Sequence, residues 1–139
     1  MTGWPNIVFL GAIAVVVAAG LYVRLAPTDP ERWHTMPAAV TNRDSEGGAM
    51  RVVGAGQDGL ARLDRIIQAT PRTRVLDGSV EAGMITYVTR SRVFGFPDYT
   101  TVRQAGPQLE IYGRLRFGRS DLGVNAARID GWLQSFAQE

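Results

Sequence analysis

An apolar run near the amino terminus most constrains what this chain of 139 residues can fold into. Residues 7–23 carry no charged side chain. As a helix rising about 1.5 Å per residue they would extend about 26 Å, close to the thickness of a bilayer's hydrocarbon core. Trp4 and Tyr22 flank the run, where aromatic rings favour the membrane interface, and Arg24 can extend its charge outward. The run predicts one N-terminal transmembrane helix and leaves the rest of the chain to form a folded domain.

A cleaved secretory signal is the alternative interpretation, and the small residues of Val17-Ala18-Ala19 would suit a cleavage site. No basic side chain precedes the run, and it is longer than the apolar core of a typical signal. We therefore expect an uncleaved anchor over residues 1–25, a single pass that holds the protein in the inner membrane through residues 7–23. Gly11, Ala14 and Ala18 place small residues on one helix face, where another membrane helix could approach closely.

Composition excludes several classes of site. The chain has no cysteine and one histidine, His34, so a disulfide, a thiol nucleophile or a multi-histidine metal centre has no ligands, and we expect no metal and no cofactor. All fifteen basic residues are arginine, although the net charge is only +2. Guanidinium groups suit carboxylate and phosphate partners. Near-neutral charge and a membrane tether argue against a nucleic-acid partner.

The segment after the apolar run contains three prolines and an adjacent pair of glycines. Its composition predicts an extended linker over residues 26–49 that lies along the membrane surface, with Trp33 near the lipid headgroups. The folded domain would then occupy residues 50–139.

Beyond the linker, hydrophobic periodicity predicts the element order β-α-β-β-β-β-α. This order predicts an α+β fold, an antiparallel sheet of about five strands with two helices on one face. Asp58 is expected to cap the first helix, and Asp77-Gly78 to form a turn. The expected strands are residues 50–53, 73–76, 84–93, 99–104 and 109–117, and the expected helices are residues 58–70 and a final one from about residue 124, which buries Ile129, Trp132, Leu133 and Phe136.

Seven arginines between residues 90 and 128 are accompanied by only three acidic residues, Asp98, Glu110 and Asp121. Strand alternation would place Arg90 and Arg92 on one face and pair Arg114 with Arg116 on the neighbouring strand. With Arg119, these side chains predict an anion- or partner-binding surface. The alternative is a solvated sheet face with ion pairs to the three acids. The loop Phe94-Gly95-Phe96-Pro97-Asp98 is expected to plug the core edge with its phenylalanines and to leave Asp98 as a pairing partner or a base.

A short junction, residues 118–128, precedes and begins the last helix. Ser120, Asp121 and Asn125 are the residue types that bond to free backbone N–H groups at a helix start, which is one role for them. A helix start beside Arg119 and Arg128 also suits an anion. We expect the strand arginines and this junction to converge in one electropositive site.

These motifs together resemble a known family. Arg90-Ser91-Arg92, Phe94-Gly95-Phe96-Pro97-Asp98, Arg116 and the run from Gly118 to Asn125 with Arg128 are similar to DUF1499, a domain-of-unknown-function family of proteobacterial envelope and plastid proteins. The linker is similar to that of membrane-anchored alphaproteobacterial members. Two positions depart from the family pattern: Tyr99 stands where many members carry a second acid, and Tyr112-Gly113-Arg114-Leu115-Arg116 replaces an Arg-Ser-x-Ser-Arg strand.

The membrane side receives two opposite indications. Arg24 and Arg32 follow the apolar run, and the positive-inside rule would place the domain in the cytoplasm. Many members of the resembled family lie on the non-cytoplasmic side, which favours the periplasm. We expect the periplasmic side.

Three functions remain open at this point. The first is a non-catalytic binding or assembly module for an anionic ligand or a membrane-protein partner. The second is an enzyme acting on an anionic envelope substrate, with Asp98 or Asp121 as base. The third is an accessory subunit of an inner-membrane complex.

Overall fold

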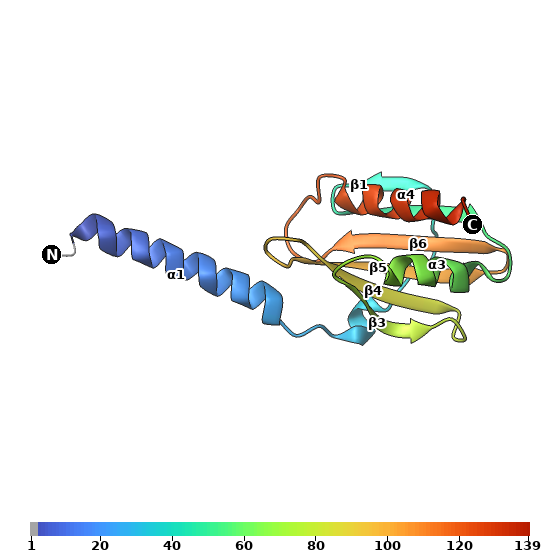
Figure 1. Ribbon diagram of the computed structural model, residues 1–139, viewed down its shortest axis with the longest axis horizontal. Helices are drawn as coiled ribbons and strands as arrows, with labels where there is room; N and C mark the ends of the chain where they lie inside the picture. The colour runs from blue at the N-terminus through green and yellow to red at the C-terminus, as the bar shows by residue number, and fades with distance from the viewer. Residues whose placement is uncertain (1–2) are drawn as a thin grey trace.

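A six-stranded antiparallel sheet forms the centre of the computed structural model, which describes residues 3–139 (Figure 1). The strand order is β1-β2-β6-β5-β4-β3. The strands are β1 (Arg43–Ser45), β2 (Gly48–Gly54), β3 (Thr73–Ser79), β4 (Met84–Arg90), β5 (Pro97–Ala105) and β6 (Gln108–Leu115). The helices are α1 (Trp4–Leu25), α2 (Pro30–Trp33), α3 (Gly59–Gln68) and α4 (Val124–Phe136). The predicted α+β class is confirmed.

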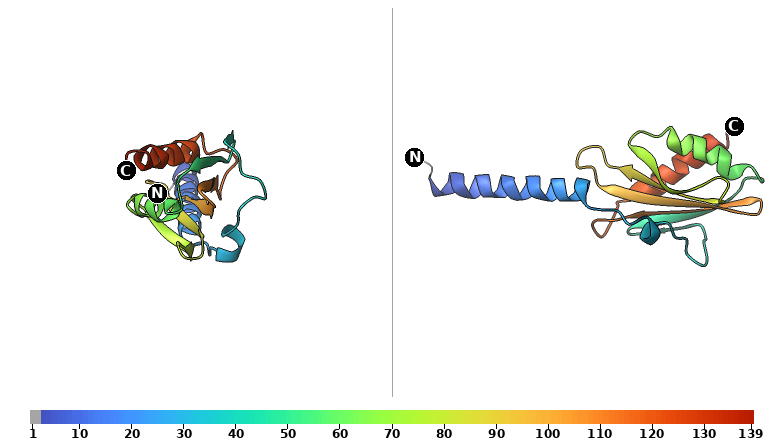
Figure 2. Two further views of the ribbon diagram at one scale, coloured as in Figure 1. Left: turned by 90° about the vertical axis from the view of Figure 1, so that its right-hand side faces the viewer. Right: turned by 90° about the horizontal axis from the view of Figure 1, so that it is seen from below.

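Helices α3 and α4 both pack on one face of the sheet, as the sequence predicts (Figure 2). The core between them and the sheet is apolar because strand residues alternate, so that every second side chain points toward the helices. The largest core side chains that are fully buried are Leu63, Ile67, Ile85, Tyr87, Val102, Leu109, Ile111 and Ile129.

Helix α1 projects away from the domain along the long axis of the molecule (Figure 1). Its 22 residues have a mean hydropathy of 2.3 over the most apolar window, which is long and apolar enough to cross a membrane. Its side chains are exposed almost throughout, in contrast to those of a core helix. The helix is consistent with a membrane anchor or with a signal sequence.

The segment predicted to be an extended linker, residues 26–49, is instead packed onto the domain. It contains the short helix α2 and the strand β1, which is the sixth strand that the sequence analysis missed. Trp33 does not lie free near the headgroups: its indole stacks on Tyr99 with ring centroids 4.1 Å apart. The sequence conceals this packing, because it depends on the stacking of Trp33 and on hydrogen bonds from distant strands to the backbone of this segment.

Two local signals are corrected by the structure. Asp77-Gly78 is not a turn but lies inside β3, next to a bulge between Val75 and Asp77, and Gly78 has φ +88°. Glycine permits this backbone angle, and a bulge uses it as readily as a turn does. Asp58 makes no capping bond to α3; the side chain of Gln104 on β5 accepts one from Leu60 N at 2.9 Å instead.

Helix α4 approaches the sheet closely at Gly113 on β6. A Cβ added there would lie 2.8 Å from Ile129 Cδ1 and 3.2 Å from Asn125 Oδ1 of α4. Both neighbours are fully buried, so neither can move away easily. Glycine at this position therefore sets how near the first turns of α4 lie to the sheet.

Gly113→Ala is expected to lower the free energy of unfolding by about 1–3 kcal/mol, the usual cost of overpacking a core. Gly54→Ala is the matched control, because a Cβ at Gly54 on β2 meets nothing within 4 Å. Denaturant unfolding of the full chain in neutral detergent measures both variants. Equal midpoints for the two variants would contradict the close approach.

Candidate functional site

The ten residues predicted to form one binding surface lie in four separate places. Arg90 and Arg92 line a pocket at the edge of the sheet next to α1. Asp98, Asp121, Asn125 and Arg128 form a network on the helix-covered face. Arg114 and Arg116 lie on the opposite face beneath residues 27–33, and Arg119 and Ser120 lie in the exposed β6–α4 loop. The expected convergence of all the arginines does not occur, because successive elements turn them to different faces.

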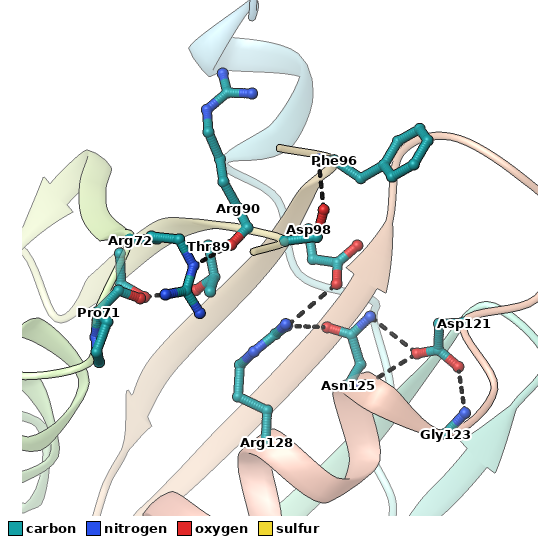
Figure 3. Close-up of polar contacts among 12 residues, drawn as sticks. Pro71, Arg72, Thr89, Arg90, Phe96, Asp98, Asp121, Gly123, Asn125 and Arg128 are labelled. Atoms are coloured by element: carbon teal, nitrogen blue, oxygen red, sulfur yellow. Dashed lines mark hydrogen bonds and ion pairs between the residues drawn. The ribbon is translucent and has the colours of Figure 1, made fainter. Parts of the chain in front are cut away.

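Asp98 and the start of α4 are joined by a chain of hydrogen bonds (Figure 3). Arg128 Nη1 donates to Asp98 Oδ2 at 3.2 Å and to Asn125 Oδ1 at 3.1 Å. Asn125 Nδ2 in turn donates to Asp121 Oδ2 at 2.9 Å. Asn125 is fully buried and Arg128 is largely buried, so the chain links β5 to α4 through desolvated polar groups. Such a network fixes the helix to the strand.

Burial raises the pKa of Asp98, and the nearby Arg128 opposes this effect without overcoming it. The carboxylate is thus a group with an altered proton affinity, which is typical of some catalytic residues. Neither Asp98 nor Asp121 lines either of the two pockets described below, and both are engaged with protein donors. Their geometry favours the pairing role over the role of a base.

Side chains of the junction before α4 accept hydrogen bonds from its own backbone N–H groups. Asp121 Oδ1 accepts from Gly123 N at 2.9 Å, and its Oδ2 accepts from Asn125 N at 3.0 Å. Ser120 Oγ accepts from Leu122 N at 3.2 Å. The carboxylate therefore occupies the free N–H groups at the helix start, which an anionic ligand would otherwise use. The capping interpretation of these side chains fits the structure.

Arg114 lies on the other face, and it is buried without a carboxylate partner. Its guanidinium donates to Thr101 Oγ1 at 2.8 Å, to the Tyr112 carbonyl at 3.1 Å and to the Trp33 carbonyl. Burial lowers the pKa of Arg114 to about 10, so the group remains charged at neutral pH. These three acceptors offset part of the cost of burying the charge.

Arg116 repeats this arrangement one step nearer to α1. It donates to the Pro27 carbonyl at 2.8 Å and to the hydroxyls of Thr28 and Tyr99, each at 3.2 Å. We call residues 27–34 the covering segment, because its carbonyl groups and Trp33 occupy the surface over these two arginines. Both arginines therefore bind the covering segment to β6, and their guanidinium groups are engaged within the protein.

An open pocket of about 610 Å³ lies where the start of β3 and the end of β4 meet the end of α1. Five arginines line it, and no acidic side chain does. We call it the basic pocket. Its arginines are Arg24, Arg72, Arg74, Arg90 and Arg92, and its other lining residues are Thr73, Val88, Ser91 and Gly95.

Backbone contacts hold three of these arginines in place. Arg24 Nη2 donates to the Val93 carbonyl at 2.9 Å, and Arg90 Nη1 donates to the Gly95 carbonyl at 2.9 Å. Arg72 has φ +58°, and its Nε donates to the Arg90 carbonyl at 3.1 Å. Figure 3 shows the Arg90 guanidinium directed away from the Asp98–Arg128 pair. The basic pocket is thus separate from the network on the helix face.

A second, smaller pocket of about 240 Å³ lies between α1 and the β4–β5 loop, and only apolar residues line it. We call it the apolar pocket. Its lining residues are Val16, Ala19, Gly20, Val23, Phe94 and Phe96. Phe94 and Phe96 were expected to plug the core edge, but they are 55% and 40% exposed and face α1 and Phe117. They lie outside the core because the β4–β5 loop places them against α1.

The sequence analysis missed Arg72 and Arg74 and treated Arg24 only as a flank of the apolar run. A signal for the first two was present. A hairpin of β3 and β4 pairs Thr73 with Thr89, which brings the start of one strand to the arginines at the end of the other. No local pattern could have placed Arg24 in the pocket, because its position depends on how α1 meets the β4–β5 loop. Among residues 3–139, no group of three His, Asp or Glu side chains is arranged to hold a metal ion.

The fold and the two pockets define a small α+β domain that follows an apolar helix and carries a basic pocket at the junction. The match to a family model agrees with the resemblance of the motifs: residues 23–136 match the model described as "Protein of unknown function (DUF1499)", so the chain belongs to this family. No curated protein and no solved structure matches the chain.

The titration of Asp98 gives a testable pH dependence. Because burial raises its pKa in the folded state above the ordinary value of 3.8, the folded protein retains this proton to higher pH than the unfolded chain. Stability should therefore fall as the pH rises from 3.8 toward neutrality. Asp98→Asn removes the titration and keeps an acceptor for Arg128.

Denaturant unfolding of the full chain in neutral detergent, at several pH values, measures the effect. The free energy of unfolding of the original protein should decline relative to that of Asp98→Asn as the pH rises. The opposite slope would mean that attraction to Arg128 outweighs burial.

Proposed function

We propose that this protein is a non-catalytic binding module, held at the inner membrane by α1, whose basic pocket binds an anionic ligand. One observation carries the proposal: five arginines line one pocket, and none of the five forms an ion pair within residues 3–139. Other arginines of the chain are paired, such as Arg51 with Asp44 and Asp130. Of the ten arginines without an ion pair among the described residues, five therefore lie together where a ligand could reach them.

Electrostatics supports an anion as the ligand. Like charges gathered in a concave site raise the local potential and attract counter-ions. Guanidinium groups bind phosphate or carboxylate oxygens through paired, charge-assisted hydrogen bonds. Arg24, Arg72 and Arg90 are already oriented by backbone carbonyls, so less side-chain freedom is lost on binding. Arg74 and Arg92 are exposed and free to close on the ligand.

Two contacts and the exposure of α1 support an uncleaved anchor. Arg24 belongs to α1 and lines the basic pocket. Tyr22 packs edge-on against Phe117 of the domain, with ring centroids 6.1 Å apart. Apart from Val23, the apolar side chains of α1 are largely exposed, which suits lipid contact. The small-residue face of Gly11, Ala14 and Ala18 is also exposed, so pairing with another membrane helix stays a prediction.

Replacing Arg74 and Arg92 together with alanine tests the binding site, because neither side chain holds the fold through a described bond. The probe is glycerol phosphate, added to the full chain in neutral detergent and followed by calorimetry. Loss of two guanidinium groups should weaken binding at least about tenfold, which corresponds to about 1.4 kcal/mol.

The matched control is the double variant Arg43→Ala and Arg65→Ala, which removes the same charge from β1 and α3. It should bind the probe as the original protein does. Equal weakening in both double variants would show a general charge effect and would defeat the proposal.

The periplasmic side is proposed from the family resemblance alone. Alkaline phosphatase fused after Glu139 should be active, and a green fluorescent protein fused there should not fluoresce. The intact mass of the membrane-extracted protein should include the apolar helix. A fluorescent fusion would place the domain in the cytoplasm, and a mass lacking α1 would show that the helix is a cleaved signal.

A further inference from the structure

We propose that the basic pocket and the apolar pocket together bind one molecule of an anionic glycerophospholipid. Its phosphate headgroup would lie among the arginines, and part of one acyl chain would lie in the apolar pocket. This inference rests on the proposed function and names the class of ligand.

The two pockets lie on either side of one junction. In the β4–β5 loop, Gly95 lines the basic pocket while its neighbours Phe94 and Phe96 line the apolar pocket. In α1, Arg24 lines the basic pocket while Val23 lines the apolar pocket. Adjacent residues of the same two segments thus separate a charged hollow from an apolar one. A glycerophospholipid has this same division, with a charged headgroup joined directly to alkyl chains.

The apolar loop is costly to leave in water. Val93 is 71% exposed and Phe94 is 55% exposed, next to the last turns of α1. Apolar side chains of this size are more stable when they are removed from water. If α1 spans the bilayer, the loop enters the outer part of the hydrocarbon, and Arg24 lies at headgroup level. The environment of the junction is then lipid.

The size of the apolar pocket fits an alkyl segment. Its volume of about 240 Å³ would hold roughly eight groups of the size of water, at about 30 Å³ each. Gly20 contributes to this space, because a Cβ added there meets nothing within 4 Å. Part of one acyl chain fits, and the rest would lie along α1. A soluble phosphate would fill only the basic pocket and leave the apolar one without a partner.

Gly20→Leu fills the apolar pocket from the side of α1. Gly11→Leu is its matched control, since it adds the same side chain to the same helix, also into open space, away from the pocket. Native mass spectrometry of the full chain, released from micelles that contain equal phosphatidylglycerol and phosphatidylcholine, counts the bound lipids. Gly20→Leu should retain about tenfold less phosphatidylglycerol than the original protein. Gly11→Leu should retain it unchanged, and equal retention by the two variants would overturn the inference.

A second pair of variants tests the loop side. Phe94→Ser should reduce phosphatidylglycerol retention, whereas Val93→Ser should not, because Val93 lines neither pocket. Both should bind glycerol phosphate with unchanged affinity.

The soluble probe separates the two proposals. If the original protein binds glycerol phosphate but retains phosphatidylglycerol no better than phosphatidylcholine, the lipid inference fails and the proposed function stands. If it binds neither the soluble probe nor the anionic lipid, both fail.

Discussion

The buried guanidinium of Arg114 is the constraint on which the position of the whole domain depends. A charge that is 92% removed from solvent requires acceptors, and one of them is the carbonyl of Trp33 in the covering segment. The Trp33 indole stacks on Tyr99, and Arg116 binds the Pro27 carbonyl. The covering segment is thereby held on the sheet, and α1 meets the domain at a fixed place. The basic pocket is completed in this way, since Arg24 comes from α1 while its other arginines come from the turn before β3, from β3 and β4, and from the loop that follows β4.

The fold was largely predictable from the sequence because its signals are local. The stripe of Leu60, Leu63, Ile66 and Ile67 identifies α3, and alternation identifies the four longer strands of the carboxyl-terminal half. The missed features depend on distant contacts. Strand β1 exists through its pairing with β2, and the cap of α3 comes from Gln104 on β5. Neither partner can be identified by a pattern of neighbouring residues.

The site was less predictable, because alternation along a strand does not say what covers its faces. Arg114 and Arg116 do lie on one face, as expected, but the covering segment occupies it. Arg90 and Arg92 were correctly identified as neighbours in a basic surface, while the pairing with β3 and the contact with α1 were missing. Asp98 was expected either to pair with a strand arginine or to act as a base; it pairs with an arginine, but the partner, Arg128, is supplied by α4.

The tight fastening of the covering segment determines how far the domain can travel. A free stretch of eight residues would let the domain wander by roughly 15 Å, at about 5–6 Å times the square root of the residue number. Bound to β5 and β6, the same stretch gives almost no slack. If α1 is retained as the proposed membrane anchor, the domain would therefore stay close to the lipid surface. A binding partner would then reach the domain by diffusing in the plane of the membrane or by docking from the solvent.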